Sequence, residues 1–245
     1  MNLMEFHDSL HNFSTAKSIE ELTELCRFHC RQLGFDHFIY ALRVPTFFAD
    51  SRLLLINGYP ENWVEHYFEQ GFNTDDPVLA YCGKHIIPIQ WHDLACTRSS
   101  PGERVMHEAA DFGLKTGISM PVHSLQGELG ILSFVLNQDF KCGREVTEHA
   151  RPYIQLLAAH LHEAVRRVAG LIENNNKPQL TLREQECLRW AADGKTSWEI
   201  AQLLRMSERT VNFHLNNAML KLDVCNRQHA VAKATLQGLI HPRPF

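Results

Sequence analysis

The sequence predicts a two-domain α+β protein. The N-terminal domain is expected to be an α-β-α sandwich with a five-stranded antiparallel sheet, because strand-like runs occur in pairs joined by short turns, with helices before, between and after them. The C-terminal domain is expected to be all-α, with four helices of helix-turn-helix type, because two helix starts lie close together across a short turn. We place the domains at residues 1–171 and 180–245, with a linker at residues 172–179.

The composition is that of a globular protein with reduced thiols. Hydrophobic residues make up 44% of the 245 residues, which is enough for buried cores in one or two domains. No apolar run approaches the ~20 residues that span a bilayer, and residues 1–10 lack the basic and apolar regions of a signal peptide. The seven cysteines are odd in number and include no Cys-x-x-Cys pair. We therefore expect a cytoplasmic protein that does not associate with a membrane.

Capping residues and glycines set the bounds of the first two helices. We expect a helix at about residues 3–13, and a second that starts at the capping box of Ser18 and Glu21 and ends at Gly34. The second helix contains Cys26, His29 and Cys30, and these three side chains are also possible metal ligands. Cys26 and His29 fall on the apolar stripe of the helix and no second ligand pair is present, so we expect ordinary packing and no metal.

The sheet is predicted from strand-like runs, and further helices are predicted around them. The runs are His37–Arg43, Arg52–Asn57, His85–Gln90, Gly117–His123 and Glu128–Leu136. The further helices start at Pro60, at Asp75-Asp76-Pro77, at Ser100 (ending at Gly113) and at about Arg144 (ending near Ala169). Pro152 is expected to kink the last of these helices or to break it in two.

The stretch Leu180–Leu222 carries three helix starts. Thr181 with Glu184 and Thr196 with Glu199 have the spacing of capping boxes, and Ser207 is a third N-cap. Only Arg205-Met206 separates the second helix from the third. One face of the third helix is apolar and the opposite face is polar; the residues are Val211, Leu215, Ala218 and Leu222 on the first, and Arg209, Asn212, Phe213 and Asn216 on the second.

Charge separates the two halves of the chain. Residues 175–245 contain ten Lys or Arg against six Asp or Glu, whereas the remainder contains fourteen against twenty-two. A basic module on an acidic body is typical of one double-stranded-DNA-binding domain attached to a domain of another kind. The polar face of the third helix is then expected to reach base edges.

The C-terminal motif resembles the LuxR-type helix-turn-helix domain. The resemblance rests on Glu184, Leu188, Trp190, Gly194-Lys195-Thr196, Glu199-Ile200-Ala201, Thr210-Val211 and His214. It implies that Asn212 and Asn216 contact bases, and asparagine can make two hydrogen bonds to adenine. The expected phosphate contacts are Arg209, Thr210, Lys195 and Ser197, with Lys221 and Arg227 as further candidates. For Arg209 and Lys221, a solvated charged face is an equally good alternative.

The N-terminal domain concentrates amphipathic aromatic residues around one acid. Tyr59, Trp63, Tyr67 and Trp91 surround Asp76 in the sequence, and such residues line apolar pockets that orient a ligand by a few hydrogen bonds. Each of them alone is more often a core residue. The domain has no Gly-rich phosphate loop, nucleophile elbow or metal-binding cluster. We therefore expect a binding domain, with no enzymatic activity, cofactor or metal.

The same residues resemble the acyl-homoserine-lactone-binding domain of LuxR-type quorum-sensing regulators. The resemblance rests on Tyr59-Pro60, Trp63, Tyr67, Asp76-Pro77, Pro88, Trp91, Gly113 and Gly117. It implies that Trp63 donates to the lactone carbonyl, that Asp76 accepts from the ligand amide N–H, and that Tyr59 and Ser133 donate to the amide carbonyl. Trp91 would wall the lactone ring, with Leu114 and Ala109 nearby, while Tyr67 and Gly117 serve packing and backbone geometry.

The resemblance also bears on the acyl chain of the ligand. Positions that line the chain in the family are Ala41, Leu53, Leu79 and Ile131. Val64 and Val78 replace polar residues that help some members bind a 3-oxo group. Leu53 and Ile131 are larger than the residues that some receptors for long chains carry at these positions. We therefore expect a short or medium chain without a 3-oxo group.

A long apolar stripe is open to two interpretations. Ile154, Leu157, Ala158, Leu161, Ala164 and Val168 either pack on the domain's own sheet or, as the family implies, form a dimer seam. A homodimer would place two recognition helices on an inverted-repeat operator, and RNA polymerase is a further expected partner.

Three other functions are alternatives to a lactone-responsive regulator. The first is a response regulator, which would need a parallel receiver domain. The second is an enzyme that acts on a lactone or amide, and the third is a receptor without its own synthase or with a non-lactone ligand.

Overall fold

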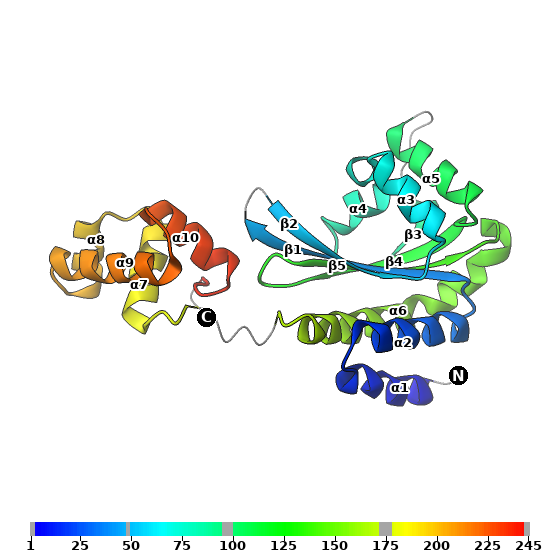
Figure 1. The fold of residues 1–245 in the computed structure, drawn as a ribbon, viewed down its shortest axis with the longest axis horizontal. Helices are drawn as coiled ribbons and strands as arrows, with labels where there is room; N and C mark the ends of the chain where they lie inside the picture. Colours follow the sequence, from blue (N-terminus) through cyan, green and yellow to red (C-terminus); the bar gives the residue numbers. More distant parts are fainter. Residues whose placement is uncertain (1–2, 48–49, 95–99, 172–177, 243–245) are drawn as a thin grey trace. The chain divides into compact units, whose positions relative to one another are not determined.

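A computed structural model describes residues 3–47, 50–94, 100–171 and 178–242. The chain divides into two compact units, one made of Met1–Val44, Leu53–Ser124 and Glu128–Glu173, and the other of Asn174–Phe245 with the short segments Pro45–Arg52 and Leu125–Gly127. The first holds helices α1–α6 and most of the sheet, and the second holds helices α7–α10 (Figure 1). Within the described ranges, no helix is both long and apolar enough to cross a membrane.

The sheet has five antiparallel strands, as predicted, and the structure gives their order as β2-β1-β5-β4-β3. The strands are β1 (His37–Phe47), β2 (Asp50–Asn57), β3 (Ile89–Gln90), β4 (Thr116–His123) and β5 (Leu129–Leu136). The predicted strand at His85–Gln90 is shorter than expected, because only its last two residues pair with β4. Pro88 has no N–H to donate to a ladder, so pairing begins after it.

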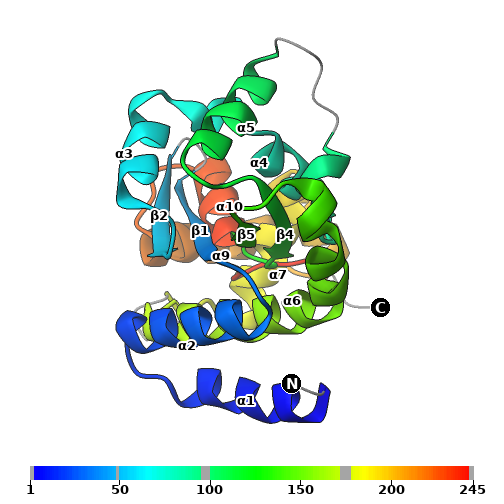
Figure 2. The ribbon, with the colours of Figure 1, turned by 90° about the vertical axis from the view of Figure 1, so that its right-hand side faces the viewer.

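Helices cover both faces of the sheet (Figures 1 and 2). On one face lie α2 (Ile19–Gln32) and α6 (Phe140–Val168), and α1 (Leu3–Thr15) packs against these two helices on the side away from the sheet. On the other lie α3 (Glu61–Glu69), α4 (Pro77–Cys82) and α5 (Pro101–Asp111), with the short turns η1 (Phe72–Thr74) and η2 (Trp91–Asp93). This arrangement is the predicted α-β-α sandwich.

The alternation of side chains along β5 separates two cores. Leu132, Phe134 and Leu136 are buried in the main core with residues of α1, α2 and α6. Ile131 and Val135, on the opposite face, belong to two smaller clusters under α3, α4 and α5. Because successive side chains of a strand point to opposite faces, the odd-numbered residues of β5 line the space between the sheet and α3–α5.

The apolar stripe of α6 packs within its own domain. Ile154, Leu157, Ala158 and Leu161 have no exposed surface, Ala164 is 3% exposed, and Val168 packs against the same core. The interpretation of this stripe as a dimer seam is therefore wrong, because the core of the same chain already covers it. The helix also begins earlier than predicted, at Phe140, and continues through Pro152 without a break.

His29 confirms the packing interpretation of the α2 stripe. It is fully buried, and its ring lies edge-on to Phe6 and Phe28 and stacks on Phe13. Burial lowers the pKa of His29 to about 4. The described part of the chain contains no group of three potential metal-ligating side chains.

The second unit is built from four helices, as predicted, and the first three have the predicted starts; the start of the fourth, after Asn226, was not predicted. They are α7 (Leu182–Ala192), α8 (Ser197–Leu204), α9 (Glu208–Leu222) and α10 (Arg227–Leu236). Both capping boxes are formed, at the starts of α7 and α8, and the Ser207 side chain caps α9. The greater part of the linker predicted at residues 172–179 lies outside the described residues.

Candidate functional site

The residues predicted to bind a ligand are brought together between the sheet and helices α3–α5. The sheet supplies Ala41, Ile131 and Ser133, and the helices and their ends supply Tyr59, Trp63, Tyr67, Asp76, Val78, Trp91, Ala109 and Leu114. Most of them fall into two adjacent apolar clusters, one around Trp63 and one around Val78 and Ile131. Trp91 packs against both clusters and so lies at their boundary.

Trp63 is held in a cluster of aromatic rings. Its indole is 4% exposed, and its centroid lies 5.3 Å from that of Phe112, 5.8 Å from that of Tyr67 and 6.1 Å from that of Phe72. Rings from α3, η1 and the end of α5 therefore fix the plane of the indole, which a directional N–H donor requires.

Asp76 is a partly buried carboxylate that caps a helix and lies among the residues predicted to bind a ligand. Its Oδ1 accepts the backbone N–H groups of Val78 at 2.7 Å and Leu79 at 3.4 Å, at the N-terminus of α4. Its Oδ2 accepts the Tyr67 hydroxyl at 2.8 Å. Burial raises the pKa of Asp76, and these hydrogen bonds oppose the rise. The pKa of Tyr67 is raised by burial and by Asp76, so Tyr67 remains a donor.

A row of polar groups crosses the site on the sheet. The Trp91 Nε1–H donates to Ser119 Oγ at 2.9 Å, and Ser119 Oγ lies 2.7 Å from Ser133 Oγ, its cross-strand neighbour. Tyr59 continues the row: burial and Asp76 raise its pKa, while a hydrogen bond from Ser133 lowers it. Sequence reasoning missed Ser119. The register of β4 on β5, which places it opposite Ser133, was the signal needed to find it.

Gly117 makes room for Trp91. A Cβ atom at this position would lie 2.6 Å from the indole ring, well inside van der Waals contact. The indole therefore lies against the bare backbone of β4, with its N–H directed to Ser119 two residues further along. The predicted packing role of Gly117 is confirmed.

The apolar side of the site is enclosed by a second cluster. Val78, Cys82, Ile89 and Ile131 are buried there, with Leu79, Tyr81, Trp91, Leu94, Met106 and Leu129 packed against them. Burial raises the pKa of the Cys82 thiol to about 12, so this side chain is an uncharged part of the cluster. The sequence did not indicate Cys82 as a residue of the site. Leu53, expected to line an acyl chain, is instead 46% exposed on β2.

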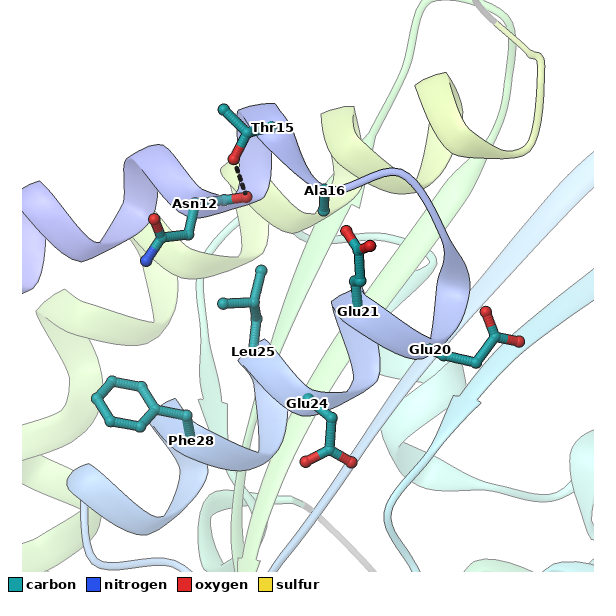
Figure 3. A pocket seen from close by; sticks show the side chains of 8 residues that line it. All are labelled: Asn12, Thr15, Ala16, Glu20, Glu21, Glu24, Leu25 and Phe28. Carbon is teal, nitrogen blue, oxygen red and sulfur yellow. Dashed lines mark hydrogen bonds between the residues drawn. The ribbon is translucent and has the colours of Figure 1, made fainter.

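An open groove of about 700 Å³ lies elsewhere, between α1 and α2 (Figure 3). Leu25 and Phe28 form its apolar part and Glu20, Glu21 and Glu24 its acidic part. No predicted ligand residue lines it, so it is separate from the candidate site.

The recognition helix α9 has the predicted two faces. Val211, Leu215, Ala218 and Leu222 are buried, at most 4% exposed, in the core of the C-terminal unit. Arg209, Asn212, Phe213 and Asn216 are exposed on the opposite side, and Thr210 is partly exposed. Ser197 of α8 donates to Asn212 Oδ1 at 2.7 Å. Two candidate DNA contacts from adjacent helices are thus held together on one surface.

Two of the candidate phosphate contacts have other partners in the structure. The Lys221 ammonium binds both carboxylate oxygens of Glu184, at 2.8 and 3.0 Å, and Glu184 also accepts from the backbone N–H of Thr181. Arg227 donates to the backbone carbonyl of Lys195. Lys221 therefore fastens the end of α9 to the start of α7, a role that the sequence did not indicate.

Comparison with known proteins identifies both halves of the chain. Residues 18–165 match the autoinducer binding domain, and residues 178–234 match the bacterial regulatory proteins of the luxR family. The transcriptional activator protein VanR of Vibrio anguillarum is 36% identical over 214 residues, which cover 86% of this chain and 87% of that protein. The chain belongs to the LuxR family.

Two further comparisons cover nearly the whole chain, one by sequence and one by structure. The transcriptional activator protein LuxR of Aliivibrio fischeri is 30% identical over 243 residues, covering 98% of this chain and 96% of that protein. The crystal structure of Escherichia coli SdiA superposes with a TM-score of 0.78 at 29% identity, covering 98% of this chain and 99% of that chain. The relatives are transcriptional regulators, in agreement with the prediction that the chain is not an enzyme. The N-terminal match excludes the response-regulator alternative.

Proposed function

We propose that this LuxR-family regulator binds an acyl-homoserine lactone in the N-terminal domain and, as a cytoplasmic homodimer, binds an inverted-repeat operator to regulate quorum-sensing genes. RNA polymerase is the further partner in this proposal, since VanR and LuxR are named as activators. A receptor without its own synthase would use the same site and the same mechanism.

The observation that carries the proposal is the position of Asp76. Its carboxylate accepts the hydroxyl of Tyr67, which packs against the Trp63 cluster. It also accepts the backbone N–H groups of Val78 and Leu79, whose side chains belong to the second apolar cluster. A buried carboxylate is costly unless donors surround it, and the amide N–H of the ligand would be an additional donor. Trp63, Tyr59 and Ser133 would then meet the two carbonyl oxygens.

Ligand binding would act on DNA binding through stability and dimerisation. Burial of an acyl chain contributes about 0.8 kcal/mol per CH₂, which stabilises the folded receptor over its unfolded state. In a two-fold dimer the two α9 helices would contact half-sites about one helical turn apart. Asn212 and Asn216 would contact bases, and Phe213, Arg209, Thr210, Lys195 and Ser197 would border the same surface.

Two residues of the second apolar cluster support a short or medium acyl chain without a 3-oxo group. Val78 is 6% exposed and Ile131 is 5% exposed, so both are buried in the apolar cluster that is proposed to contact the chain. Neither offers a hydrogen bond to a second carbonyl. Leu53 is exposed and therefore does not support the inferred length of the acyl chain.

Mass spectrometry of the protein purified from a culture that produces acyl-homoserine lactones tests the ligand. The wild-type protein should retain a lactone, and Asp76→Asn and Trp63→Phe should retain less. Both variants should also need an about 10- to 100-fold higher lactone concentration for a response, because the loss of one partner of a buried hydrogen bond costs ~1–3 kcal/mol. Full sensitivity in either variant would contradict the site.

The proposed DNA contacts are tested by footprinting. Asn216→Ala should bind the ligand normally yet fail to protect the operator. Normal protection would contradict the role of Asn216 as a base contact.

A monoacylglycerol is the second candidate ligand. Escherichia coli SdiA has been solved in complex with octanoyl-rac-glycerol, and that structure matches this chain with a TM-score of 0.77 at 28% identity. A glycerol hydroxyl can donate to Asp76 in place of the amide N–H. The same mass spectrometry distinguishes the two ligands by their mass.

A further inference from the structure

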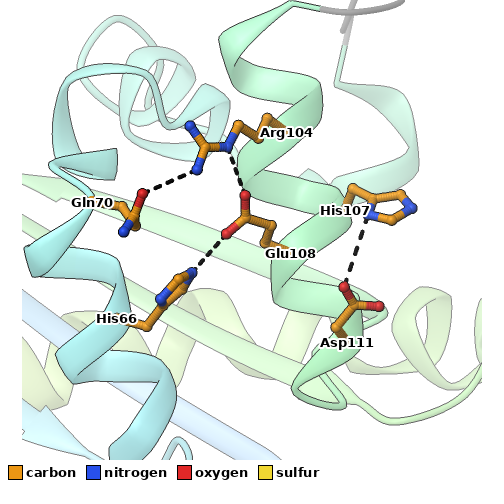
Figure 4. Close-up of polar contacts among 6 residues, drawn as sticks. All are labelled: His66, Gln70, Arg104, His107, Glu108 and Asp111. Atoms are coloured by element: carbon orange, nitrogen blue, oxygen red, sulfur yellow. Dashed lines mark hydrogen bonds and ion pairs between the residues drawn. The ribbon is translucent and has the colours of Figure 1, made fainter.

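An outer network of polar side chains joins α3 to α5 (Figure 4). Glu108 of α5 accepts from Arg104 Nε at 2.6 Å with one oxygen and lies 2.6 Å from His66 Nε2 of α3 with the other. Arg104 Nη2 also donates to Gln70 Oε1, just after α3, at 3.0 Å. One carboxylate thus connects two of the three helices that cover the candidate ligand site.

The inner side of this network touches the aromatic cluster of the site. The His66 ring stacks on Phe112, with centroids 5.5 Å apart and planes 25° apart, and its centroid lies 6.0 Å from that of Trp63. The Arg104 guanidinium lies 5.3 Å from the centroid of Phe72, another neighbour of Trp63. A continuous series of contacts therefore leads from Glu108 to the indole proposed to bind the ligand.

We propose that Glu108, with His66 and Arg104, is a latch that holds α3 against α5, positions Trp63 and sets how long the ligand stays bound. This inference rests on the proposed ligand site and adds residues that do not themselves touch the ligand. Opening the latch would let α3 move away from α5 and so open a route between the site and solvent.

The charges of the latch favour the closed arrangement. Glu108 is 24% exposed and His66 29% exposed, so water competes only in part for the hydrogen bond between them. Hydrogen bonds from His66 and then Arg104 hold the pKa of Glu108 below its usual value, which keeps the acceptor ionised. Charge-assisted hydrogen bonds of this kind are stronger than those between neutral groups.

The same helix offers a matched control. Asp111 lies three residues after Glu108 and pairs with His107 of α5 at 4.0 Å, so that this contact stays within one helix. Both of these side chains are exposed, at 70% and 79%. Asp111→Asn therefore removes one negative charge from α5 without touching the junction with α3.

The test measures ligand exchange on the full-length protein. Wild type, Glu108→Gln, Glu108→Ala, Arg104→Met and Asp111→Asn are purified with isotope-labelled N-octanoyl-homoserine lactone, then diluted into excess unlabelled lactone. Release should be about three- to tenfold faster for Glu108→Ala and Arg104→Met, the effect expected for a partly exposed charged contact. Glu108→Gln, which keeps one acceptor oxygen, should be intermediate, and Asp111→Asn should match wild type.

Uptake separates a latch from a contact that merely stabilises the fold. A latch that opens more often should speed uptake as well as release, so the equilibrium affinity should change less than either rate. A lower unfolding temperature with unchanged release and uptake would show a structural role only and would overturn the proposal. If Glu108→Ala fails to fold, Glu108→Gln and Arg104→Met decide the question. Failure of the wild-type protein to retain lactone would instead overturn the proposed function itself.

Discussion

His29 should make the stability of the protein sensitive to mild acid. The ring is fully buried between α1 and α2, and neither of its nitrogens has a hydrogen-bond partner among the described residues. Burial lowers its pKa from 6.5 to about 4. As pH falls below 6.5, the unfolded chain binds a proton that the folded chain excludes. The free energy of unfolding is therefore highest above pH 6.5 and decreases until the pH reaches about 4, the pKa of His29 in the folded protein.

The size of the effect follows from this difference in pKa. A difference of about 2.5 units corresponds to roughly 3 kcal/mol once the pH is below both values, and to about 2 kcal/mol at pH 5. His29→Leu removes this loss of stability in acid. It also removes two buried polar atoms that have no hydrogen-bond partner in the described part of the chain, so it should stabilise the protein at pH 7.5 by about 1 kcal/mol.

Urea unfolding of the full chain between pH 7.5 and pH 5 measures the difference. Wild type should lose about 2 kcal/mol more than His29→Leu across this range. His7→Gln is the control, because the His7 side chain is 74% exposed, and it should behave like wild type. Parallel pH profiles for wild type and His29→Leu would refute the reasoning, since the buried imidazole would then not be the group that titrates.

Two further predictions concern the ligand site and the DNA surface. Gly117→Ala should displace the Trp91 ring, because the new Cβ would lie 2.6 Å from it. Overpacking of this kind costs about 1–3 kcal/mol. The lactone concentration that gives a half-maximal reporter response should therefore rise about tenfold or more. An unchanged response would show that the ring can move without consequence. Arg209→Met should lower the slope of log affinity against log salt by about one, whereas Lys221→Met should leave the slope unchanged, because its ammonium is bound to Glu184. Equal slopes for the two variants in an operator-binding titration would contradict this distinction.

The helix starts of the C-terminal domain were predictable because their causes are local. A threonine and a glutamate three residues apart satisfy each other's backbone N–H groups, and this holds at Thr181 and at Thr196. The buried face of α9 was predictable for a similar reason, since the period of the helix places Val211 and Leu215 on one side.

Features that depend on distant parts of the chain were not predictable in this way. The contact of Ser119 with Ser133 requires the register of β4 on β5, and the bond of Lys221 to Glu184 requires the packing of α9 on α7. Periodicity along α6 showed that one face is buried but not which surface covers it. The His66–Glu108 contact, which spans forty-two positions, has no signal in either helix alone.

The outward face of α6 is the part of this helix that is left for a contact between two copies of the chain, because its apolar stripe is buried. The outward face of this helix carries Gln155, Ala159 and His160, all exposed, together with Leu156 at 40% exposure. Leu156→Arg should therefore convert a dimer at micromolar concentration to a monomer in analytical ultracentrifugation, because a charge in the apolar centre of an interface is costly, yet it should leave the domain folded. Ile86→Arg is the matched control, since Ile86 is 73% exposed between α4 and β3. If Leu156→Arg stays dimeric, α6 does not form the interface, and the two recognition helices must be held together by another surface.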